Sequence, residues 1–289
     1  MRNGFSEAHG MGTCNTQMQY DDLDDGTRNI LFNYIAESLK SQYGQRWSNN
    51  YKSKEVDSLC RLVMTHVLQP RFDIDELYGL DYLIPVTEKI ISQAPFNEVF
   101  DFIEALCRFR YDKYDETKLK SFCELLNTLL EYEYVGYRII DGHFTPITDK
   151  NEIAAIEEAC DNTYQGPRTH ISKAVALISD REHKDYKNCI KESISAVESL
   201  CSIIVGKEGT VLSTALKQLE DSGLKIHPVL KNAFSKLYAY TCDEKGVRHA
   251  EGLLESEVTF EDAKFMLVSC CAFVNYLTAN YGRVGGARA

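Results

Sequence analysis

Residues 184–206 read KDYKNCIKESISAVESLCSIIVG, a stretch in which apolar residues recur every three or four positions. The recurring apolar residues are Ile190, Ile194, Val197, Cys201 and Ile204. This spacing puts their side chains on one face of an α-helix, so the stretch predicts a long amphipathic helix packed in a helical bundle. Similar patterns cover most of the sequence and predict a mainly α fold.

The composition favours the same fold class. The sequence has only 6 prolines and 17 glycines in 289 residues, and its 44% hydrophobic and 26% charged residues are ordinary for a globular protein. At about 150 residues per domain, this length predicts two domains. No stretch approaches the roughly 20 apolar residues that a membrane span needs, and the N-terminus lacks the apolar region of a signal peptide. We therefore expect no membrane association and a cytoplasmic location.

The sequence carries none of the common signatures of a metal or cofactor site. Its ten cysteines form no CxxC pair, and its seven histidines are scattered without a spacing suited to a metal. It has no GxxxxGK phosphate loop, no GxSxG elbow and no HExxH helix. We predict no metal and no cofactor, and we interpret the cysteines as buried thiols in a reducing compartment.

The first part of the chain predicts a series of helices. They are expected over 27–43, 54–69, 86–93, 95–110 and 115–132, with Pro70, Pro85 and Pro95 at the boundaries between segments. One passage breaks this pattern, because Asp141-Gly142 separates the β-rich runs YVGYRII (134–140) and HFTPI (143–147). Asp-Gly between such runs predicts a β-hairpin over 134–147, in which both turn residues adopt positive φ.

Asp149 and Glu152 then predict the start of a helix that ends near Asn162. The segment QGP at 165–167 marks the domain boundary, which we place between domains of 1–163 and 164–282. The second domain is expected to contain helices over 167–180, 184–206, 211–221, 228–241 and 259–281, followed by a disordered tail at 283–289.

The two domains differ in charge. The whole chain carries a net charge of −11, which argues against non-specific binding to nucleic acid or to an anionic membrane. However, residues 1–163 contain 28 acidic and 16 basic residues, a net charge of −12, whereas residues 164–289 contain 15 and 16, a net charge of +1. We therefore expect the first domain to repel a partner that carries phosphates, and only the second domain to be able to bind one.

The second domain contains a candidate site in the sequence TCDEKGVRHA at 241–250. The planar guanidinium of Arg248 is suited to holding a phosphate. His249 titrates near neutral pH, so it can take a proton from a 2′-hydroxyl or give one to a leaving oxygen without a metal. Asp243 lies in the same segment. The alternative is a loop arginine paired with a carboxylate beside a half-exposed histidine.

Glu198 joins this candidate set. It follows Ile194 by four residues and precedes Cys201 by three, so its carboxylate lies at the edge of the apolar stripe and faces the bundle. A carboxylate there needs a partner, and Arg248 or His249 would supply one from the facing loop. The alternative is that Glu198 reaches solvent or bonds a nearby lysine.

At these residues the sequence resembles a known family. The helix ESISAVESLC (192–201) and the segment GVRHA (246–250) resemble HEPN domains, specifically those of AbiJ-type abortive infection proteins. FSE (5–7), DDGTRN (24–29) and LFN (31–33) are similar to the N-terminal domain that accompanies them. The resemblance implies a helical bundle, a homodimer and a metal-independent ribonuclease.

The family motif places four to six residues between its arginine and a following histidine. Arg248 fits the arginine position and His249 occupies the polar position that follows it, but residues 253–255 are Leu, Leu and Glu. Three pairs meet the spacing elsewhere, and we interpret all of them as chance: Arg2 with His9, Arg61 with His66, and Arg138 with His143, which straddles the predicted hairpin turn. His249 must then itself act as the acid or base.

We therefore expect an anti-phage effector whose HEPN-like domain cleaves RNA such as tRNA. Arg248 would bind the phosphate and His249 would move a proton, while Glu198 or Asp243 orients them. The acidic N-terminal domain would regulate, sense or bind a partner such as an antitoxin, a regulator or a phage trigger. The alternative is a HEPN module without catalysis that serves as a dimerising RNA-binding or adaptor protein in the same defence setting.

Overall fold

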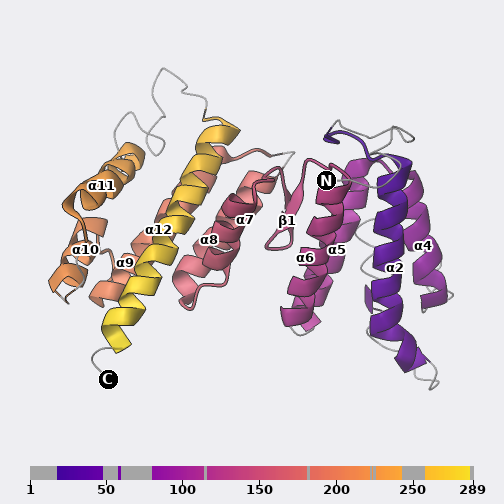
Figure 1. The fold of residues 1–289 in the computed structure, drawn as a ribbon, viewed down its shortest axis with the longest axis horizontal. Coiled ribbons are helices and arrows are strands. Elements are labelled where there is room, and N and C mark those ends of the chain that lie inside the picture. The colour runs from indigo at the N-terminus through magenta and orange to yellow at the C-terminus, as the bar shows by residue number, and fades with distance from the viewer. Residues whose placement is uncertain are drawn as a thin grey trace, which may run out of the picture. The chain divides into compact units, whose positions relative to one another are not determined.

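The computed structural model describes residues 18–47, 58–59, 80–113, 116–180, 183–221, 223, 226–242 and 258–286. In these ranges the chain is mainly α with one small antiparallel hairpin, as the sequence predicts (Figure 1). Its residues pack as two units, Met1–Pro146 and Ile147–Ala289. No helix among the described residues combines the length and the hydropathy that a membrane crossing needs.

The packing divides earlier in the chain than the predicted domain boundary. Helix α7 (Lys150–Cys160) lies between the division after Pro146 and the boundary predicted after residue 163. It packs against α8 (Gln165–Ser179) and α12 (Phe260–Gly286). Asn275 of α12 donates a hydrogen bond to the backbone oxygen of Ala155 in α7 at 3.0 Å. The helix α7 thus packs with the second unit, while the domain limits 1–163 and 164–282 stay a prediction.

Four helices are described in the first unit. They are α2 (Asp25–Trp47), α4 (Leu80–Gln93), α5 (Phe96–Lys113) and α6 (Glu116–Tyr132). The boundary predicted at Pro85 is wrong, because this proline lies inside α4. Proline lacks a backbone N–H, so it costs the helix the bond to the carbonyl of Asp81, which lies in the first turn. The helix predicted over 54–69 lies outside the described residues except for 58–59.

The core of the first unit forms between these helices. α2 packs against α4 and α6, and α5 packs against α4 and α6. The apolar face predicted for α5 is buried at Val99, Phe100, Ile103, Leu106 and Cys107. Phe100 stacks on Phe144 of the hairpin with ring centroids 4.0 Å apart, so the hairpin is part of this core.

The predicted hairpin is confirmed. Strand β1 (Arg138–Ile140) pairs with β2 (His143–Thr145), with Ile139 opposite Phe144. The turn residues Asp141 and Gly142 have φ of 49° and 81°, the positive values that a two-residue hairpin turn requires. Asn127 of α6 accepts a hydrogen bond from Ile139 N at 2.7 Å and donates one to Ile139 O at 2.8 Å, which fixes the hairpin on the helix.

Helix α9 (Tyr186–Val205) organises the second unit. It packs against α8, α10 (Leu212–Asp221), α11 (Pro228–Cys242) and α12. The predicted apolar stripe from Ile190 to Ile204 is buried along its length. Asp185 caps the start of α9, and Gly206 ends it with a left-handed φ of 71°. The last helix, α12, continues through Gly286, into the segment predicted as a tail.

The described cysteines fit their interpretation as buried thiols, with one exception. Those whose side chains the structure describes are all thiols, and all of these are buried except Cys123 of α6, which is half-buried. Burial raises the pKa of Cys189, Cys201 and Cys270 to about 12, so these groups stay protonated and unreactive at neutral pH.

A capping box opens α12, and it makes a pH-dependent contribution to stability. Asp262 Oδ2 accepts hydrogen bonds from Thr259 Oγ1 at 2.7 Å and from Thr259 N at 3.0 Å. These bonds favour the ionised carboxylate and lower the pKa of Asp262 below its usual 3.8. The contribution is therefore present above pH 3.8 and is lost as the pH falls through the lower pKa of the folded state.

We expect Asp262→Asn to lower the free energy of unfolding at pH 7 by about 0.5–1 kcal/mol. Urea denaturation measured between pH 7 and pH 2.5 checks this, because the difference from the wild type should shrink below about pH 4. Glu208→Gln, at an exposed carboxylate of the same unit, is the control and should stay close to the wild type throughout. A difference that persists unchanged to the lowest pH would contradict the capping role.

Candidate functional site

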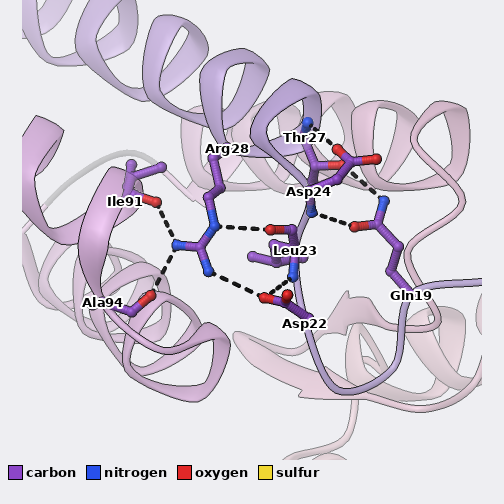
Figure 2. Close-up of polar contacts among 8 residues, drawn as sticks. All are labelled: Gln19, Asp22, Leu23, Asp24, Thr27, Arg28, Ile91 and Ala94. Atoms are coloured by element: carbon purple, nitrogen blue, oxygen red, sulfur yellow. Dashed lines mark hydrogen bonds and ion pairs between the residues drawn. The ribbon is translucent and has the colours of Figure 1, made fainter.

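Polar side chains gather at the start of α2 (Figure 2). Asp24 Oδ1 accepts a hydrogen bond from Thr27 N at 2.7 Å and caps the first turn of the helix. Gln19 Oε1 accepts one from Asp24 N at 2.7 Å, while Gln19 Nε2 donates to Thr27 Oγ1 at 2.9 Å and to the backbone oxygen of Glu133 at 2.7 Å. This network joins the segment before α2 to the end of α6.

Arg28 extends the network from α2 to α4. Its Nη1 donates to the backbone oxygens of Ile91 and Ala94, each at 2.8 Å, and its Nε donates to the backbone oxygen of Leu23 at 2.9 Å. Its Nη2 lies 3.4 Å from Asp22 Oδ1 (Figure 2). The guanidinium thus closes the C-terminal end of α4, where carbonyls point outward and positive charge is favourable. Because only 11% of its side chain is exposed, Arg28 serves the fold and is not placed to bind a phosphate.

Arg138 and His143, one of the pairs that meet the Arg–His spacing by chance, are also structural. Arg138 is 5% exposed, and its Nη1 donates to the backbone oxygens of Val135 and Tyr137, each at 2.7 Å. Burial lowers the pKa of this guanidinium from its usual value. His143 lies 3.5 Å from the carboxylate of Glu104 in α5. Arg138 therefore holds the backbone that enters the hairpin.

In the second unit, Glu198 of α9 meets Tyr238 of α11. The tyrosine hydroxyl donates a hydrogen bond to Glu198 Oε1, and both side chains are half-buried. Tyr238 lies about one turn before Cys242, where α11 ends. The ring of Tyr238 also lines a small hollow between α9, α11 and α12, together with Val197 and Phe234. This contact ties the C-terminal part of α11 to α9.

A second polar pair joins α8 to α9 nearby in sequence. His170 Nδ1 lies 2.7 Å from Glu192 Oε2, with 32% and 22% of the two side chains exposed. Glu192 belongs to the ESISAVESLC segment that carries the family resemblance. A carboxylate bonded to Nδ1 orients the imidazole ring. The pair links α8 to α9 through His170 Nδ1, and the other ring nitrogen, Nε2, takes no part in this contact.

Comparison with known protein families identifies the N-terminal part of the chain. Residues 3–162 match the AbiJ N-terminal domain 4 family, which is more than half of the 289 residues. The chain belongs to this family. Neither the comparison with curated proteins nor the comparison with solved structures returned a match.

Membership in the AbiJ family associates the protein with abortive-infection defence. The match contains the DDGTRN segment, which includes Asp24, Thr27 and Arg28 of the network in Figure 2. It ends before the helices that resemble a HEPN domain, so that part of the assignment stays a prediction.

Of the predicted site residues of this AbiJ-family protein, Glu198 lies within the described chain, and it faces α11 as its helical position indicates. Arg248, His249 and Asp243 lie outside the described residues, so their placement beside Glu198 stays a prediction. Asp243 is the residue that follows α11 directly.

Two residues of this region were missed by the sequence analysis. Tyr238 and His170 find their partners on other helices, 40 and 22 residues away along the chain. Pairs at such separations depend on how the helices pack, and the periodicity of one helix does not reveal them. The one sequence signal that could have identified Tyr238 is its position in a helical pattern directly before the candidate segment.

Proposed function

We propose that this AbiJ-family protein is an anti-phage effector whose second unit is a HEPN-type, metal-independent endoribonuclease that acts on cellular RNA such as tRNA. The hydrogen bond between Tyr238 and Glu198 is the observation that supports this most. It holds a carboxylate beside the end of α11, and the chain continues from there into the segment that contains Arg248 and His249.

In the proposed reaction, Arg248 binds the scissile phosphate through its planar guanidinium. His249 takes the proton from the 2′-hydroxyl or returns one to the leaving 5′-oxygen. Glu198 or Asp243 orients these two side chains, and Tyr238 restrains Glu198. A homodimer would bring two such segments together around one RNA-binding cleft.

The first unit has a different role in this proposal. Its excess of acidic residues disfavours binding of RNA, since residues 1–146 contain 23 acidic and 15 basic residues, a net charge of −8. A regulatory or sensing role is more consistent with that charge, and an antitoxin, a regulator or a phage component would be its partner. Contact with that partner would control cleavage by the second unit.

A second candidate function follows from the motif. Residues 253–255 contain no histidine, so the segment departs from the spacing of active HEPN domains that the resemblance implies. In this alternative the second unit has lost catalysis. It would then bind RNA, dimerise or serve as an adaptor in the same defence setting.

Incubating the purified full chain with tRNA in EDTA distinguishes the two functions. The proposal expects cleavage in EDTA that disappears in Arg248→Ala and in His249→Ala. His183→Ala is the matched control, because this histidine is 84% exposed and lies outside the proposed site. The adaptor function would be favoured if the protein binds RNA but leaves it intact when the phage trigger is present. It would also be favoured if Arg248→Ala and His249→Ala leave the toxicity of the protein unchanged.

A further inference from the structure

Two thiols of the first unit face each other across a helix pair. Cys107 lies on α5 and Cys123 on α6, and their sulfur atoms are 3.9 Å apart. A disulfide bond is about 2.05 Å long, so the two sulfurs need to approach by roughly 2 Å to form one. We propose that Cys107 and Cys123 are an oxidative modification site that forms a reversible intramolecular disulfide.

The surroundings of the cysteines favour reaction at this pair. Cys123 is half-buried, whereas the other cysteines whose side chains the structure describes are buried. Burial raises the pKa of Cys189, Cys201 and Cys270 to about 12, which leaves almost no thiolate on them at neutral pH. An oxidant that approaches from solvent therefore reaches Cys123 before these buried thiols, and the sulfur of Cys107 lies 3.9 Å from that of Cys123.

Glutathione disulfide is an oxidant of the right chemical class. The thiolate of Cys123 attacks one sulfur of glutathione disulfide and releases one glutathione, which takes up a proton. Cys107 then gives up its proton, attacks the Cys123 sulfur of the mixed disulfide and releases the second glutathione. In total, two protein thiols are oxidised to one disulfide, and one glutathione disulfide is reduced to two glutathione molecules.

The disulfide would lie where the hairpin sits on the helices. A Cβ atom built at Gly142, in the hairpin turn, would lie 4.0 Å from the Cβ of Cys107, and Asn127 holds the neighbouring strand one turn after Cys123. The bond would close a ring of chain from Cys107 in α5 to Cys123 in α6, two residues that are 16 positions apart. A cross-link over this distance stabilises the folded state because it restricts the unfolded chain. Oxidation should therefore raise the melting temperature by about 5 °C.

Mass spectrometry of the full chain tests the proposal. The folded protein is incubated with glutathione disulfide at pH 7.5, its remaining thiols are alkylated, and it is digested with protease. We expect one linkage between the peptides that contain Cys107 and Cys123, a loss of about 2 Da, and full reversal by dithiothreitol. Cys107→Ser should instead accumulate glutathione on Cys123, and Cys123→Ser should abolish both products.

Cys201→Ala is the control, because it removes a buried thiol from the other unit and should leave the linkage unchanged. A stable glutathione adduct on Cys123 of the wild type would overturn the proposal, as would linkage between two chains. Recovery of Cys107 and Cys123 as alkylated thiols while glutathione modifies other cysteines would also overturn it. None of these outcomes depends on whether the protein cleaves RNA.

Discussion

Arg28→Met is expected to lower the free energy of unfolding by about 3 kcal/mol. The substitution keeps an unbranched apolar stem but removes the donors that serve the backbone oxygens of Leu23, Ile91 and Ala94. Those carbonyls are then left at the junction of α2 and α4 without the charged group that satisfies them. Urea denaturation of the full chain, with hydrogen exchange followed in α2 and α4, measures the loss.

Arg108→Met is the matched control in the same unit. Arg108 is 63% exposed and pairs with Glu104 one turn away in α5, so its removal should change the free energy of unfolding by less than about 0.5 kcal/mol. Arg28→Lys should behave more like Arg28→Met than like the wild type, because one ammonium group does not reproduce the planar fork of donors. A change at Arg28 no larger than that at Arg108 would contradict the role assigned to this network.

Glu198→Gln is expected to lower kcat for RNA cleavage by about 100-fold, with KM changed by less than about threefold. The substitution keeps the shape of the side chain and removes the charge that, in the proposed function, orients Arg248 and His249. Tyr238→Phe removes only the hydroxyl that holds this carboxylate, so it should lower kcat by about 10-fold. Steady-state cleavage of a fluorescent RNA in EDTA provides both constants.

Tyr276→Phe is the control for these two variants. Tyr276 is a half-buried tyrosine of α12 that stacks on Phe273, and no hydrogen bond of its hydroxyl is seen among the described residues. The double variant with Glu198→Gln and Tyr238→Phe should lose little more activity than Glu198→Gln alone, because the hydroxyl acts through the carboxylate. If the loss of kcat in the double variant equals the product of the two single losses, Tyr238 does not act by positioning Glu198.

The predictions that succeeded rest on local signals. Alternating and helical apolar patterns depend on neighbours in the chain, so the burial of α9 from Ile190 to Ile204 followed from sequence spacing. Asp141-Gly142 predicted a hairpin because few residues adopt positive φ at both turn positions. Pro85 was expected at a boundary but lies inside α4, since a proline six positions into a helix interrupts only one early hydrogen bond.

The candidate site was less accessible to sequence reasoning. The edge position of Glu198 on its helix predicted that it would meet a partner, and the structure supplies Tyr238 of α11. Identifying that partner required the packing of α11 on α9, which no local pattern specifies. For the same reason, the tie from Arg28 to Ile91 and Ala94 joins residues more than 60 positions apart and had no signature in the DDGTRN segment.

The chemical ends of the RNA products test the central claim most directly. Attack of a 2′-oxygen on phosphorus, with proton transfer by His249, expels the 5′-oxygen and leaves a 2′,3′-cyclic phosphate on one fragment and a 5′-hydroxyl on the other. Mass spectrometry of tRNA from phage-infected cells that express the chain should detect both ends, and Arg248→Ala and His249→Ala should abolish them. Intact tRNA in these cells, or fragments with 3′-hydroxyl ends, would contradict the proposed ribonuclease.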